Sequence, residues 1–65
     1  MKIMLKQINE DATNYLVYVM DLANSPLICE YATNENKTDV VNKLSNQFGN
    51  ISMVEEMTYN EYINQ

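Results

Sequence analysis

The chain has 65 residues, with nine acidic residues against four lysines and no arginine or histidine, so its formal net charge is −5. A chain this short is expected to form one domain over residues 1–65, and its stability is marginal because it buries only about 60% of its unfolded surface. The single cysteine excludes an intrachain disulfide, and the lack of histidine argues against a metal site. The negative charge disfavours binding to phosphate backbones and suits a partner with a basic surface, although it would also serve solubility alone.

Three apolar segments in the first half of the chain predict β-strands. They comprise residues 2–8, 15–20 and 27–32. A short polar loop, residues 9–14, joins the first two segments and predicts an antiparallel hairpin. The second segment is rich in aromatic and β-branched residues and is apolar on both faces. We therefore expect a central strand that is covered on both sides, or one whose second face is covered by a partner.

A break that contains Pro26 separates the hairpin from the third strand, at residues 22–26. Alternation in the third strand places Leu27, Cys29 and Tyr31 on one face. Cys29 is expected to be a buried small hydrophobe with an inert thiol, because its neighbours are apolar.

A helical period follows the third strand. Four apolar residues fall within an arc of about 100° when they are placed on a helix. They are Val40, Val41, Leu44 and Phe48. Either Asn36 or Thr38 can cap the start of this helix, and Gly49 is expected to end it in a left-handed conformation. The stripe predicts an amphipathic helix packed on one face of a sheet.

The end of the chain predicts one more strand and a short helix. Residues 51–57 alternate as a strand, and Thr58 with Glu61 matches a capping box for a helix over residues 59–64. The sequence therefore predicts an α+β fold in the order β-β-β-α-β with a short C-terminal helix. Its sheet is expected to be four-stranded and mainly antiparallel, with the amphipathic helix on one face.

Groups that carry catalysis are scarce in this sequence. Without histidine, the Ser-His-Asp and Cys-His arrangements are excluded, and a single glycine does not make a phosphate-binding loop. The neighbouring carboxylates Glu55 and Glu56 point to opposite faces of a strand, so they do not form a dyad. We expect no enzymatic activity, no cofactor and no metal.

Acidic and aromatic residues instead predict a surface that binds a partner protein. The candidates are Glu10, Asp11, Glu55, Glu56, Tyr59, Glu61 and Tyr62. No basic residue follows Lys43, so the sequence predicts an acidic C-terminal part without neutralising cations. Tyrosine is enriched in interface hot spots, and an acidic surface is complementary to a basic one. The alternative is a solvated surface that binds nothing.

An assembly role is the second prediction from the sequence. One helix covers only one face of a sheet, so the other face needs shielding, and a symmetric dimer is the commonest way to provide it. No signal peptide or bilayer-spanning segment is visible, which predicts a cytoplasmic location, with neither membrane nor nucleic acid as a direct partner.

In kind, the chain resembles the small acidic proteins that phages and mobile elements of Gram-positive bacteria use against host nucleases or polymerases, such as anti-CRISPR proteins. The resemblance rests on size, on the absence of arginine and histidine, and on Glu55, Glu56 and Glu61 with the neighbouring tyrosines. It implies a non-enzymatic inhibitor that engages a basic site on a host protein, such as a nucleic-acid-binding groove, in the host cytoplasm.

Overall fold

A computed structural model describes residues 1–21 and 26–65 of the chain. Its elements are β1 (Lys2–Gln7), β2 (Tyr15–Met20), β3 (Leu27–Thr33), α1 (Lys37–Phe48), β4 (Met53–Met57) and α2 (Tyr59–Ile63). This order confirms the predicted α+β class and the succession of elements. The break predicted at residues 22–26 lies, except for Pro26, outside the described residues.

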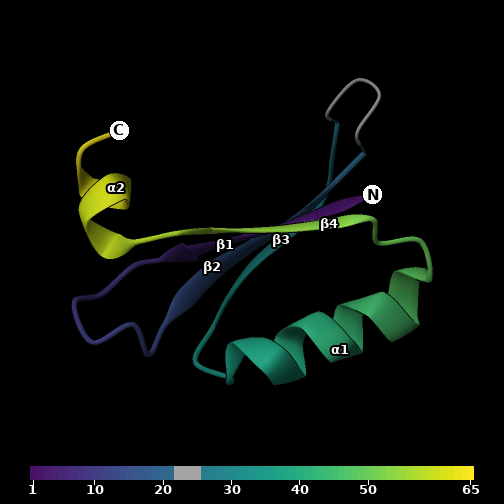
Figure 1. Cartoon of the computed structure of the whole chain (residues 1–65), viewed down its shortest axis with the longest axis horizontal. Coiled ribbons are helices and arrows are strands. Elements are labelled where there is room, and N and C mark those ends of the chain that lie inside the picture. Colours follow the sequence, from purple (N-terminus) through teal and green to yellow (C-terminus); the bar gives the residue numbers. More distant parts are fainter. Residues whose placement is uncertain (22–25) are drawn as a thin grey trace.

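The four strands form a mixed sheet in the order β3-β2-β1-β4. β2 pairs antiparallel with β1, as the predicted hairpin requires, and also antiparallel with β3, whereas β1 and β4 are parallel. Consequently β1, β3 and β4 run in the same direction and finish at the same end of the sheet. α1 connects the two edge strands, β3 and β4, and crosses one face of the sheet on the way (Figure 1).

The core lies between α1 and the two central strands. Among the described residues, the buried apolar side chains are Ile3, Leu5, Tyr15, Val17, Val19, Val40 and Leu44. Val41 and Phe48 complete the predicted helical stripe and pack against this core from its margin. Cys29 is half-buried rather than fully buried, because β3 is an edge strand and gives it neighbours on one side only.

Local hydrogen bonds fix the ends of α1. The side-chain oxygen of Asn36 accepts a hydrogen bond from the backbone N–H of Thr38 at 2.8 Å. Of the two candidate N-cap residues, Asn36 and Thr38, it is therefore Asn36 that caps α1. Gly49 ends the helix with φ of 70°, in the left-handed region, and its N–H donates to the Ser45 carbonyl at 2.9 Å. Glycine adopts this conformation without the steric cost that a Cβ imposes.

The start of β3 contains a β-bulge that the sequence pattern does not reveal. Cys29 pairs with Val19 and Leu27 pairs with Met20, so Ile28 is an extra residue in the ladder. A bulge of this kind re-aims the side chains before it. The prediction that Leu27 shares a face with Cys29 is therefore wrong, since Leu27 stands opposite Met20.

Candidate functional site

The parallel direction of three strands brings acidic residues to one end of the sheet. The loop after β1 carries Glu10 and Asp11, the segment after β3 carries Glu35 and leads to Asp39 in the first turn of α1, and α2 after β4 carries Glu61. All five side chains are exposed. We call these five residues the acidic end. The N-terminus lies at the opposite end of the sheet (Figure 1).

The hairpin loop at the acidic end is held by Asn9. The side-chain oxygen of Asn9 accepts hydrogen bonds from the backbone N–H groups of Thr13 and Asn14, each at 3.1 Å, and its amide nitrogen donates to the Thr13 hydroxyl at 2.7 Å. These bonds close the loop from within. Glu10 and Asp11 therefore occupy a turn whose shape is set by its own side chains rather than by a partner.

A hollow of about 350 Å³ lies at the acidic end, between the hairpin loop and the segment that joins β3 to α1. Its walls are formed by Ala12, Thr13, Tyr15, Asn34, Glu35, Asn36 and Lys37. The Glu35 carboxylate and the amide oxygens of Asn34 and Asn36 are hydrogen-bond acceptors in this wall, and two of these residues already have donors, since Glu35 pairs with Lys43 and Asn36 accepts from Thr38. Further lone pairs of these oxygens suit the donor groups of a lysine or arginine side chain. The shared hollow also shows that these two segments, far apart in the sequence, lie side by side.

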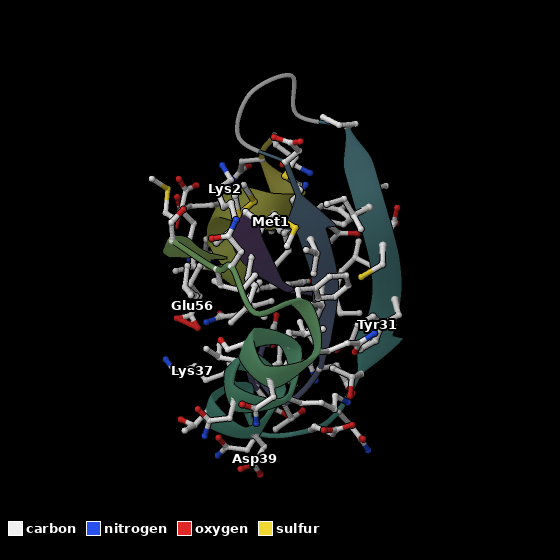
Figure 2. The ribbon with its side chains drawn as sticks, turned by 90° about the vertical axis from the view of Figure 1, so that its right-hand side faces the viewer. Met1, Lys2, Tyr31, Lys37, Asp39 and Glu56 are labelled. Atoms are coloured by element: carbon white, nitrogen blue, oxygen red, sulfur yellow. The ribbon has the colours of Figure 1, made fainter. Side chains whose placement is uncertain are left out.

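The predicted lack of neutralising cations around Glu55 and Glu56 is wrong. The ammonium nitrogen of Lys2 lies 3.4 Å from a carboxylate oxygen of Glu55. The ammonium nitrogen of Lys37 lies 3.3 Å from both carboxylate oxygens of Glu56, and Figure 2 shows these two side chains meeting from α1 and β4. Both lysines come from distant parts of the chain, so the sequence neighbourhood of the glutamates does not reveal them.

Strand alternation separates Glu55 and Glu56, as predicted. Glu55 stands opposite Met4 in the β1–β4 ladder, and Glu56 stands opposite Leu5, which belongs to the core under α1. Paired residues share a face, so Glu56 lies on the α1 side and Glu55 on the other side. The expectation that the two contribute to one acidic surface with Glu61 therefore does not hold in this geometry.

The C-terminal helix α2 is tied to β1 and carries both candidate tyrosines. The backbone N–H of Tyr59 donates to the side-chain oxygen of Gln7 at 3.2 Å. The Thr58 hydroxyl oxygen accepts a hydrogen bond from the backbone N–H of Glu61 at 3.2 Å, and the Glu61 carboxylate accepts one from the backbone N–H of Thr58 at 3.2 Å, which confirms the predicted capping box. Tyr59 and Tyr62 are half-buried, so each leaves part of its side chain exposed beside the acidic end.

Another hollow, of about 270 Å³, lies between α1 and the edge strand β4. It is lined by Leu5, Lys37, Thr38, Val41, Asn42, Val54 and Glu56. The core is thin here because α1 packs over the central strands and leaves Val54 46% exposed. The Lys37–Glu56 ion pair contributes the charged part of the wall.

A group around Tyr31 was not anticipated from the sequence. The Tyr31 hydroxyl oxygen is buried and has no hydrogen-bond partner among the described residues. The ammonium nitrogen of Lys43 lies 5.6 Å from the centre of the Tyr31 ring and 2.9 Å from a carboxylate oxygen of Glu35. Burial raises the pKa of the Tyr31 phenol, partly offset by Lys43, and the hydrogen bond to Glu35 raises the pKa of Lys43.

Comparisons with protein-family models, with curated protein sequences and with solved structures found no match to this chain. Within residues 1–21 and 26–65, no three cysteine or acidic side chains gather so that they could hold a metal ion. In the same part of the chain, none of the helices combines the length and the apolar character needed to cross a bilayer.

Proposed function

We propose that this chain is a non-catalytic binding protein whose acidic end docks on the basic surface of a partner protein. The observation that carries the proposal is the common direction of β1, β3 and β4, which delivers three separate acidic segments to one end of the sheet. In the proposed role, the partner is a host protein with a nucleic-acid-binding groove, and occupation of that groove inhibits it.

Charge supports this choice of partner. Glu10 and Asp11 form no ion pair with any other described residue, so their full charge is available to a partner. Lys37 and Lys43 of α1 are engaged by Glu56 and Glu35. Complementary potentials accelerate association and suppress wrong partners, and the acceleration falls with ionic strength.

Preorganisation supports the same reading. The hydrogen bonds of Asn9 shape the hairpin loop, and the capping box shapes the first turn of α2. A surface that is already ordered loses less conformational entropy when it binds. The hollow between the loop and the β3–α1 segment then accepts a lysine or arginine side chain of the partner, while Tyr59 and Tyr62 add contact area beside it.

A matched pair of double variants tests this proposal. Glu10→Lys with Asp11→Lys changes the net charge from −5 to −1 at the acidic end, and Glu30→Lys with Glu55→Lys makes the same change on the sheet face that α1 does not cover. Exposed substitutions of this kind usually alter stability by about 0.5 kcal/mol or less. Partners are first captured from host lysate at low salt and identified by mass spectrometry. Binding of a captured partner is then measured over a salt series.

We expect the Glu10/Asp11 double variant to weaken binding tenfold or more and to flatten its salt dependence, while the Glu30/Glu55 variant changes both much less. A lysine-rich peptide provides a partner-independent probe, and its NMR titration should shift signals of residues 9–14 and 34–36. Equal losses for the two double variants would mean that only overall charge matters. Unchanged binding of the Glu10/Asp11 variant would remove the acidic end as the docking site.

The second candidate function is assembly through homo-oligomerisation, and the sheet face away from α1 favours it. Salt separates the two functions. Association held by the acidic end is lost at high salt, whereas association through apolar side chains persists.

A further inference from the structure

Strand pairing defines the side chains on the face of the sheet that α1 does not cover. Residues that pair across neighbouring strands share a face. In register, this face consists of Ala32, Leu16, Lys6 and Met57 nearest the acidic end, then Glu30, Tyr18, Met4 and Glu55, then Leu27, Met20, Lys2 and Met53. We call these twelve residues the open face. α2 lies on this side of the sheet, at one end of it, whereas α1 lies on the other side (Figure 1).

The open face is apolar and rich in methionine. Four of the five methionines of the chain belong to it, and Met1 packs against the core instead. Met53 and Leu27 are 45% and 51% exposed, so apolar surface remains uncovered at this face. Methionine is flexible and polarizable, and it is used where one apolar surface must adapt to another.

Its charges distinguish this face from the rest of the molecule. Lys2 and Lys6 balance Glu30 and Glu55, so the open face has no net charge, and the whole formal charge of −5 lies elsewhere. The ammonium nitrogen of Lys2 is 3.4 Å from Glu55, and that of Lys6 lies 4.9 Å from the centre of the Tyr18 ring. Both lysine side chains thus lie along the face, where their methylene groups add apolar area.

We propose that the open face binds the open face of a second copy of this chain. Two copies that carry −5 each repel one another through their acidic ends, but they meet without net repulsion at this neutral face. Stacking the two sheets gives the layer order helix, sheet, sheet, helix, with each α1 outside and apolar side chains interdigitated between the sheets. The dimer does not depend on the proposed partner, and it leaves both acidic ends accessible to that partner.

The area of the open face determines how tightly the two copies are expected to bind. With strands about 4.8 Å apart and about 3.3 Å per residue, four short strands cover roughly 400 Å² in projection. Stable interfaces bury about 800 Å² of accessible surface on each partner. Protruding side chains make the accessible area of this face larger than its projected area, but not clearly larger than that value. We therefore expect a reversible dimer with a dissociation constant in the micromolar range, on the order of 1–100 μM.

Neighbouring residues of β4 provide a matched test. Met53 lies on the open face and Val54 on the α1 side, and they are 45% and 46% exposed. Met53→Lys and Val54→Lys therefore introduce the same charge at the same strand, at equal exposure, on opposite faces. Sedimentation equilibrium from about 1 μM to 1 mM measures the dimer dissociation constant of each variant and of the unchanged protein, with melting temperature as the control for folding.

The unchanged protein should rise from 7.6 kDa towards twice that mass as its concentration increases. Met53→Lys should raise the dissociation constant tenfold or more, and Val54→Lys should leave it within about twofold. NMR spectra recorded over the same concentrations should show shifts at the open face and not on the outer side of α1. A protein that stays monomeric at 1 mM, or a loss caused by Val54→Lys but not by Met53→Lys, would overturn the proposal.

Discussion

Removing the hydroxyl group of Tyr31 should stabilise the protein. The hydroxyl oxygen is buried and has no hydrogen-bond partner among the described residues. A buried polar group without a partner costs roughly 1–3 kcal/mol. The Tyr31 ring is only half-buried, so we expect the lower part of that range, and Tyr31→Phe should raise the free energy of unfolding by about 1 kcal/mol. Phenylalanine keeps the ring on which Lys43 rests.

The matched control is Tyr18→Phe. Tyr18 also carries a lysine over its ring, but its hydroxyl is not a buried group without a partner. Thermal unfolding followed by circular dichroism should show a melting temperature about 4–8 °C higher for Tyr31→Phe and little change for Tyr18→Phe. A lower melting temperature for Tyr31→Phe would refute the reasoning, because it would mean that the hydroxyl has a partner in solution.

The pH dependence of the protein's stability provides a second test of the Tyr31 site. Burial raises the pKa of Tyr31 in the folded state, so the unfolded chain releases the phenol proton first as the pH rises. The stability that this shift contributes is complete below the unfolded pKa of about 10 and is lost as the pH rises through the folded pKa. Melting temperatures measured from pH 8 to 11 should therefore fall less steeply above pH 10 for Tyr31→Phe than for the unchanged protein.

Two further predictions concern the core and the open face. Leu44 is 2% exposed, so Leu44→Ala should lower the free energy of unfolding by about 2–5 kcal/mol. Denaturant unfolding measures this loss, with Asn46→Ala at an exposed position of the same helix as the control. Equal unfolding midpoints for the two variants would mean that α1 does not pack on the sheet at Leu44. Mild peroxide oxidation converts methionine to the polar sulfoxide, so it should raise the dissociation constant of the proposed dimer tenfold or more. Repair by methionine sulfoxide reductases should restore it, and oxidised protein that still associates would contradict an interface built on Met4, Met20, Met53 and Met57.

The local features of the fold were accessible from the sequence because each depends on neighbouring residues. The β-branched and aromatic composition of residues 15–20 predicted β2, and the stripe through Val40 and Leu44 predicted the buried side of α1. Gly49 and the Thr58–Glu61 capping box predicted helix ends through short-range steric and hydrogen-bonding rules. The candidate residues Glu10, Asp11 and Glu61 were likewise visible as exposed acidic residues in polar segments.

What only the tertiary structure decided was which distant segments meet. The parallel pairing of β4 with β1 places Lys2 beside Glu55 and brings the segment after β4 to the same end as the hairpin loop. The bulge opposite Met20 turns Leu27 to the open face. These outcomes depend on strand order and register, which are set by the packing of the whole core against α1. Local sequence carries charge and periodicity, but the neutralisation of a carboxylate depends on whichever cation the folded backbone places within a few ångströms of it.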